Sequence, residues 1–268
     1  MLSQLGADAA IYAGGTELLV LMKERLAHFS HLIDIKPIPG LAGISLDDAG
    51  GSISIGPLAS HRSIETSQLI RTYAPIVAEV ESQVANIRVR HTGTLGGNLC
   101  FAEPHSDPAT LLVALDAALT LTSSNSKREV PAGEFFTGLL ETVRQPDELL
   151  TSIAFDLLPG NAGSAYCRFK THERPTATIA AVLWLENGSI ADSRLVAGSV
   201  GNRPQRLTEA EALLSGQAPA PDLFGTVRNA AMNQVEIEQE GFESVDYKRH
   251  LIGVLSEQAL NQALERAA

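Results

Sequence analysis

"IYAGGTELLVLMK", residues 11–23, places two adjacent glycines between a short apolar run and a stretch with the spacing of a helix. The pattern predicts a buried strand, a Gly-Gly turn and a helix that Thr16 caps. Because glycine has no Cβ atom, it adopts positive φ and lets another group approach the peptide plane. Adjacent glycines at a strand end therefore indicate either a tight turn or a backbone cradle for an anion.

A second glycine pair follows in "HTGTLGGNLC", residues 91–100. Thr92, Thr94 and Asn98 bring short polar side chains that can bond a phosphate, a ribose or a ring edge, in a stretch too polar for a core. Asp107 follows, and its carboxylate can accept two hydrogen bonds from a ribose diol. The two stretches are candidates for binding a nucleotide, with simple structural turns as the alternative.

The first glycine pair lies at the start of its predicted helix, where unpaired N–H groups and the positive end of the helix dipole attract phosphate. The stretch is not a Walker loop, because no Gly-Lys-Ser/Thr ending follows the glycines. It also lacks the GxGxxG spacing of a Rossmann turn. A parallel-sheet nucleotide-binding domain is therefore disfavoured.

Length and composition limit the classes of protein. The 268 residues are enough for two modest domains, since single cores saturate at roughly 100–200 residues. The net charge of −11, without any basic cluster, argues against nucleic-acid binding. The chain has no signal-peptide pattern and no apolar run near the ~20 residues that span a bilayer. We therefore expect no membrane span and a cytoplasmic location.

Cysteine usage excludes an iron–sulfur site within the chain. Cys100 and Cys167 are the two cysteines, and they lie far apart without the CxxC spacing of a zinc or iron–sulfur centre. The chain is not expected to hold a cluster by itself.

The coarse pattern changes at residues 159–163, "PGNAG", which is the best candidate linker. Before it, Gly6 is expected to end a short N-terminal helix, and strands and helices then alternate. The predicted strands there are 31–35, 51–56, 118–123 and 148–158, and the predicted helices are 61–70, 74–84 and 107–117. Beyond the linker we predict strands at 165–170, 176–188 and 193–200, then helices at 207–215, 221–233 and 245–266. Strands followed by helices favour an α+β domain whose sheet is covered on one side.

These stretches resemble a known family. The resemblance is carried by "AGGTELLVLMK", "HLIDIKPIPGL", "TGTLGGNLCFAEPHSDPATLLVALDA", "ELLTSIAFD" and "YCRFKTHERPTATIAAVLWLENG". Together they resemble the FAD-binding, or medium, subunit of molybdenum hydroxylases, the group of carbon monoxide dehydrogenase and xanthine dehydrogenase. The resemblance implies an α+β protein: a two-lobed FAD-binding fold of the vanillyl-alcohol oxidase type over residues 1–158, then a smaller α+β domain over 162–268.

The resemblance also implies which residues contact FAD. The first segment would be Ile11, Tyr12, Ala13, Gly14, Gly15, Thr16, Glu17 and Leu18, with the N–H groups of Gly14, Gly15 and Thr16 on the diphosphate. The second segment would be Thr94, Leu95, Gly96, Gly97 and Asn98. Asp107 would bind the sugar, Leu150 would pack near the adenine or the ring system, and Lys170 would lie beside the flavin. No catalytic residue and no metal ligand is expected in this chain.

By the same resemblance, the chain is an oxidoreductase subunit whose FAD relays electrons. A large partner subunit would carry the molybdopterin cofactor, and a small partner subunit would carry the [2Fe–2S] clusters. The external acceptor would be NAD, oxygen or a quinone. Two alternatives stay open: an assembly protein that has lost flavin, and a stand-alone flavin reductase similar to the cell-wall enolpyruvyl reductase.

Several residues depart from the family pattern or have an open role. Val84 stands where some relatives have an aromatic residue, and the chain begins inside the family's first helix, through a misplaced start or a missing edge strand. His105 is expected to be a capping or surface histidine rather than an acid–base group. The remaining candidates are Arg88 and Arg90 for a phosphate or a partner, His91 as a loop residue, and Glu173 and Arg174 for the flavin ring.

Overall fold

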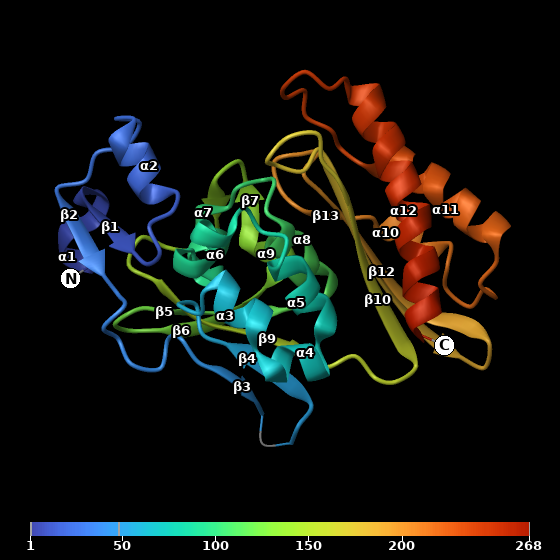
Figure 1. The fold of residues 1–268 in the computed structure, drawn as a ribbon, viewed down its shortest axis with the longest axis horizontal. Helices are drawn as coiled ribbons and strands as arrows, with labels where there is room; N and C mark the ends of the chain where they lie inside the picture. Colours follow the sequence, from blue (N-terminus) through green and yellow to red (C-terminus); the bar gives the residue numbers. More distant parts are fainter. Residues whose placement is uncertain (1, 48, 268) are drawn as a thin grey trace. The chain divides into compact units, whose positions relative to one another are not determined.

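The computed structural model describes residues 2–47 and 49–267, and these fall into two compact units (Figure 1). One unit contains the chain up to Ala102 together with Ala117–Thr137 and Glu141–Asp156. The other contains Glu103–Asp116, Gly138–Leu140 and the chain from Leu157 onward. Each unit has its own sheet and its own core.

The first unit is built on an antiparallel sheet of five strands. Its strands, in the order β3-β4-β9-β5-β6, are β3 (Ile44–Leu46), β4 (Ser52–Ile55), β9 (Leu149–Asp156), β5 (Ala118–Thr122) and β6 (Lys127–Pro131). The alternation predicted for β4 is confirmed, because Ile53 and Ile55 are fully buried and pair with Phe155 and Ile153 of β9. The antiparallel pairing agrees with the absence of Rossmann and Walker signals.

The N-terminal part of this unit forms a small parallel pair. Strand β1 (Ala9–Tyr12) and strand β2 (His31–Asp34) run parallel and are joined through helix α2 (Leu18–Lys23). They are preceded by helix α1 (Leu2–Leu5) and a 3-10 turn, Gly6–Asp8. Gly6 has φ +55, as expected for a glycine that ends a helix. Strand β1 is half-buried rather than buried, contrary to the prediction.

Helices make up most of the rest of this unit. They are α3 (His61–Thr66), α4 (Gln68–Tyr73), α5 (Pro75–Glu81), α6 (Ile87–Thr92), α7 (Leu95–Phe101) and α9 (Ala132–Phe135), and β7 (Phe136–Gly138) pairs with β8 (Glu141–Thr142). The helical stretches predicted at 61–70 and 74–84 are confirmed, with a break at Ser67, which caps α4. Helices α6 and α7 were not predicted: α7 contains two glycines and α6 contains the β-branched residues Ile87, Val89 and Thr92, all of low helix propensity.

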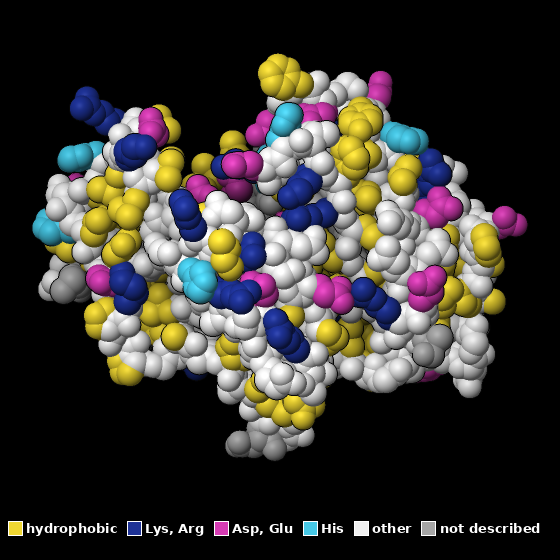
Figure 2. All heavy atoms as spheres, in the orientation of Figure 1, with side chains coloured by type: hydrophobic (Ala, Val, Ile, Leu, Met, Phe, Trp, Pro, Cys, Tyr) yellow, Lys and Arg dark blue, Asp and Glu magenta, His cyan; other side chains and the backbone are white. Residues whose placement is uncertain are grey.

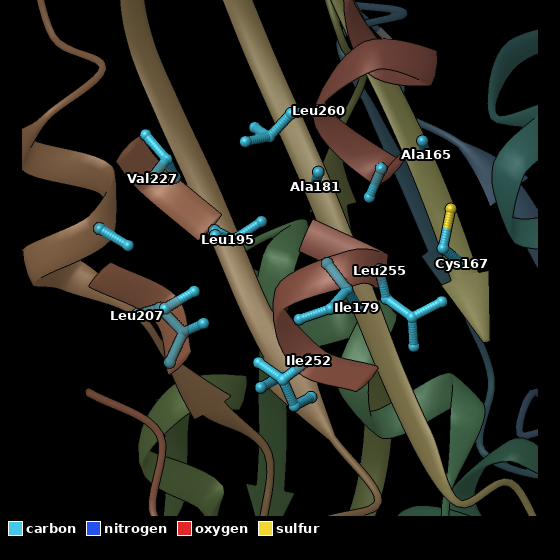
Figure 3. Close-up of a cluster of buried hydrophobic side chains, with 14 of the residues drawn as sticks. Ala165, Cys167, Ile179, Ala181, Leu195, Leu207, Val227, Ile252, Leu255 and Leu260 are labelled. Atoms are coloured by element: carbon cyan, nitrogen blue, oxygen red, sulfur yellow. The ribbon is translucent and has the colours of Figure 1, made fainter. Parts of the chain in front are cut away.

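The second unit is an antiparallel sheet with helices on it. The sheet contains β10 (Ala162–Phe169), β11 (Ala177–Glu186), β12 (Ser189–Gly198) and β13 (Gln205–Arg206), and the helices are α8 (Asp107–Ala114), α10 (Thr208–Ala212), α11 (Pro221–Gln234) and α12 (Val245–Ala267). All six elements predicted beyond the linker are present. Figure 3 shows Ile179 and Leu195 from the strands packed with Leu255 and Leu260 of α12 in the buried core of this unit.

The other face of this sheet is also covered, which corrects the expectation of a sheet covered on one side. Helix α8, which comes from the first half of the sequence, belongs to this unit. The Asp107 carboxylate accepts hydrogen bonds from Tyr166 and Arg168 of β10 at 2.7 and 2.9 Å. Thr110 lies against Gly198, where a Cβ atom would overlap its hydroxyl. The sequence predicted this helix, but local patterns do not show on which sheet a helix packs.

The distribution of charged side chains on the surface agrees with the absence of a basic cluster in the sequence. On the face that Figure 2 shows, Lys and Arg side chains are interspersed with Asp and Glu, without an extended patch of one charge. No helix within residues 2–47 and 49–267 is both long and apolar enough to cross a membrane.

A substitution of Gly163 on β10 tests the close contact between α12 and the sheet. A Cβ atom there would overlap the carbonyl oxygen of Ala263 and lie 2.5 Å from the Ala267 nitrogen, both backbone atoms of α12. We expect Gly163→Ala to destabilise the protein by about 1–3 kcal/mol in urea denaturation, because the helix must move. Gly160→Ala is the matched control, since its new Cβ atom meets nothing within 4 Å.

Candidate functional site

The two glycine stretches lie against each other in the first unit. A Cβ atom on Gly14 would overlap the Thr92 carbonyl oxygen and lie 2.8 Å from the Gly93 Cα atom. A Cβ atom on Gly93 would lie 3.3 Å from the Thr16 hydroxyl oxygen. Backbone therefore packs directly on backbone, and only glycine fits at Gly14. We call residues 13–16 and 92–97 the glycine junction.

The first segment of the glycine junction has unused backbone donors. Among the residues that the structure describes, the N–H groups of Gly14, Gly15 and Thr16 find no hydrogen-bond acceptor. Gly15 has φ +73, a conformation that L side chains rarely adopt. Successive N–H groups in such a turn form a concave site for an anion. This segment is suited to hold a phosphate.

The second segment is a helix start with its donors already bonded. The N–H groups of Leu95 and Gly96 donate to the carbonyls of Ala59 and Pro57 at 3.0 and 2.9 Å. The N–H of Gly97 donates to the Thr94 hydroxyl, which caps α7, at 3.1 Å. This corrects the interpretation of the stretch as too polar for a core, because Thr94, Leu95 and Gly96 are buried. Thr92 and Gly97, at the two ends of this segment, are exposed, and Asn98, which follows it, is partly exposed.

Thr16 does not have the predicted role of a helix cap. Helix α2 begins at Leu18, its N-cap is Glu17, and no side chain bonds its first turn. The Leu19 N–H donates to the Gly15 carbonyl at 3.0 Å, so the glycine turn leads directly into the helix. The Thr16 hydroxyl lies instead next to Gly93, at the glycine junction.

Lys36 belongs to the site and was missed in the sequence. Its ammonium group donates to the Ala13 carbonyl at 3.3 Å, pairs with Asp34 at 2.9 Å and lies 3.6 Å from the centre of the Tyr12 ring. Hydrogen bonds and charge from Lys36 lower the pKa of the Asp34 carboxyl. The parallel register, with Tyr12 opposite Asp34, places residue 36 beside the first glycines. A prediction that residues 9–12 and 31–34 pair as parallel strands would have placed Lys36 at the site.

The other residues named from the resemblance belong to other elements of the two units. Asp107 is buried in the second unit, where burial and the Asp107 charge raise the pKa of Tyr166. Leu150 is buried in β9 opposite Leu121. Lys170 follows β10 and is exposed. The carboxylate expected to meet a ribose therefore bonds the protein's own side chains.

The residues with open roles are mostly paired within the protein. In the second unit, His105 contacts Glu103 at 2.8 Å, and Arg174 pairs with the same carboxylate at 3.0 Å. In the first unit, Arg90 bonds Glu65 at 3.1 Å and the Val84 carbonyl at 3.1 Å. Arg90 thus connects α6 to Glu65 of α3, and its predicted contact with a phosphate or a partner stays a prediction. Val84 is half-buried, and Arg88 and Glu173 are exposed. His91 is exposed but lies in helix α6, so its prediction as a loop residue was wrong.

Neither cysteine forms a metal site in the described chain. Cys100 and Cys167 are free, and burial raises the pKa of the Cys167 thiol to about 11. Among the described residues, no group of three or more His, Cys, Asp or Glu side chains is placed to hold a metal ion.

Comparison with known proteins identifies the family. Residues 1–156 match the family described as "FAD binding domain in molybdopterin dehydrogenase", and residues 164–263 match the "CO dehydrogenase flavoprotein C-terminal domain". The carbon monoxide dehydrogenase medium chain of Hydrogenophaga pseudoflava is 31% identical over all of this chain and 93% of its own length. The 6-hydroxypseudooxynicotine dehydrogenase complex subunit alpha of Paenarthrobacter nicotinovorans is 30% identical over 100% of this chain and 90% of its own.

Solved structures agree with this assignment. The carbon monoxide dehydrogenase from Hydrogenophaga pseudoflava that lacks the Mo-pyranopterin moiety superimposes with a TM-score of 0.96 at 32% identity, over 100% of this chain and 93% of that one. The chain belongs to the FAD-binding subunits of the molybdenum hydroxylases. Its cofactor is FAD, and it is an oxidoreductase subunit. The α+β architecture with an FAD-binding domain and a C-terminal domain is confirmed.

The glycine junction fits a dinucleotide, and Gly14 is its most sensitive point. We expect Gly14→Ala to abolish FAD retention, because its Cβ atom would force the Thr92–Gly93 backbone away from the first segment. Flavin released from the purified protein by heat measures the loss. Gly43→Ala should retain FAD, since nothing lies within 4 Å of its new Cβ atom. Equal flavin in both variants would contradict a role for the glycine junction.

Lys36 gives a second prediction. We expect Lys36→Met to weaken FAD binding about tenfold, because it removes both the bond to the Ala13 carbonyl and a positive charge beside the free amides. Titration calorimetry at low salt measures the change. Lys23→Met is the control: it makes the same change in net charge at a residue that is 81% exposed. If both variants bound FAD equally weakly, the net charge of the protein would explain the loss, and Lys36 would have no specific role.

Proposed function

We propose that this chain is the flavin subunit of a molybdenum hydroxylase complex with a large molybdopterin subunit and a small [2Fe–2S] subunit. When bound, FAD accepts electrons from the iron–sulfur clusters and passes them to an external acceptor such as NAD, oxygen or a quinone. The proposal is supported above all by the three unpaired amides of Gly14, Gly15 and Thr16 in a chain of this family.

The chain's own residues would bind and orient the cofactor. The free amides of the first segment and the Lys36 ammonium group would hold the diphosphate, and the fully bonded start of α7 would give them a rigid base. The wider set from the resemblance remains part of this proposal: Ile11–Leu18, Thr94–Asn98, Asp107, Leu150 and Lys170. Lys170 would place a cation beside the flavin, where it would stabilise negative charge on the reduced ring.

The substrate would be selected by a partner subunit. Relatives of nearly equal coverage carry names that refer to different substrates, carbon monoxide and 6-hydroxypseudooxynicotine. The described residues offer no metal site at which such a substrate could be hydroxylated. We therefore place substrate oxidation outside this chain, and we propose that the complex works in the cytoplasm.

The chain purified alone tests this function. We expect a visible flavin spectrum, bleached by dithionite, and no oxidation of carbon monoxide or of N-heterocycles. Preparations of Gly14→Ala give the flavin-free baseline. Turnover of a hydroxylase substrate would contradict the proposed role. A colourless wild-type protein after incubation with FAD would favour an assembly protein, and rapid NADPH oxidation by the chain alone would favour a stand-alone reductase.

A further inference from the structure

A buried ionisable pair lies beneath the glycine junction. His61, the first residue of α3, and Glu81, the last residue of α5, are 3% and 2% exposed. The His61 Nδ1 atom lies 2.6 Å from the Glu81 Oε2 atom. Burying such a pair gives little net stability compared with apolar side chains of the same volume. Because the pair adds little stability, we look for its role in holding the His61 ring in one orientation.

His61 is attached to the second segment of the glycine junction by backbone and side chain. Its N–H donates to the Gly93 carbonyl at 3.1 Å, and Ser60 forms a β-bridge with Thr94. The missing Cβ atom of Gly93 would lie 3.2 Å from the His61 Cδ2 atom. The edge of the imidazole therefore packs on the Gly93 backbone, while Glu81 holds the opposite side of the ring.

Gly93 transmits this contact to the first segment. Its backbone meets Gly14 on one side, and the Thr16 hydroxyl lies close to the position of its missing Cβ atom. A rotation of the His61 ring would move the Thr92–Gly93 peptide, on which Gly14 rests. Binding groups have to stay within roughly 0.5 Å of their productive positions. The orientation of the buried His61 ring therefore affects the position of the free amides of Gly14–Thr16.

We propose that Glu81 and His61 are positioning residues: Glu81 orients the His61 ring, and the ring fixes the separation of the two segments of the glycine junction. The inference rests on the proposed FAD role of that junction. It assigns a binding function to two residues that form no hydrogen bond with any of the three free amides, and it explains why an ionisable pair is retained in the interior.

The test compares two substitutions of Glu81 in the full chain. Glu81→Gln keeps an acceptor for the His61 N–H, whereas Glu81→Met has similar length and cannot hold the ring. We expect Glu81→Met to weaken FAD binding at least about tenfold and Glu81→Gln to stay within about twofold of the parent. In phosphorus NMR, the diphosphate signals of bound FAD should shift in Glu81→Met and stay in place in Glu81→Gln.

A second measurement does not need FAD. In the apoprotein, hydrogen exchange at the Leu95 and Gly96 amides should speed up in Glu81→Met, because the bonds to Ala59 and Pro57 loosen when the ring turns. Val80→Ala, at the neighbouring buried position of α5, controls for general loss of stability and should leave these amides protected relative to the rest of the unit. If Glu81→Met does not fold, the double variant His61→Phe/Glu81→Met, which removes both ionisable groups, is expected to fold and to show the same effects.

The outcomes separate this inference from the proposed function. Unchanged exchange and unchanged FAD affinity in Glu81→Met, or in the double variant, would overturn the inference and leave the proposed function intact. Equal losses in Glu81→Met and Val80→Ala would also overturn it, since stability alone would then explain them. If the parent chain binds no FAD, the proposed function fails, and faster exchange in Glu81→Met alone would still support the positioning role.

Discussion

The direct contact between the Gly14 backbone and the Thr92–Gly93 peptide is the constraint on which the candidate site depends. No side chain fits between them, because a Cβ atom on Gly14 would overlap the Thr92 carbonyl oxygen. This close approach leaves the amides of Gly14, Gly15 and Thr16 without protein acceptors in the described chain. An unbonded N–H is unfavourable where water is excluded, as at the buried Gly14, and the three successive donors together are suited to an anionic ligand.

The two segments of the glycine junction have different roles: the first offers free donors, and the second supports it. In the first segment, the backbone donors of Gly14, Gly15 and Thr16 are unused, and Gly15 and Thr16 are partly exposed. In the second segment, the amides of Leu95, Gly96 and Gly97 are paired with Ala59, Pro57 and Thr94. A flexible pair of loops would have to be ordered when a cofactor binds, which would weaken binding. The bonded start of α7 gives the first segment a fixed base, and the buried pair of His61 and Glu81 extends that base into the interior.

Much of the fold follows from local patterns. The alternation of Ile53 and Ile55 predicted β4, and the apolar runs after residue 162 predicted the strands and helices of the second unit. Helix α7 could not be predicted this way, because tertiary hydrogen bonds to the Pro57 and Ala59 carbonyls stabilise a glycine-containing sequence of low helix propensity. Helix α8 was predicted as a helix, but its place on the second sheet depends on the Asp107 bonds to Tyr166 and Arg168.

The sequence by itself determined the two glycine stretches, their order and the family that they indicate, because glycine at a strand end leaves a signal that needs no partner. Only the tertiary structure decided which groups are available. It showed that the amides of Gly14–Thr16 are unbonded while those of Leu95–Gly97 are paired, and that Lys36 and His61 lie beside them. Hydrogen-bond partners distant in the chain decide whether a donor is free, and a local pattern carries no information about them.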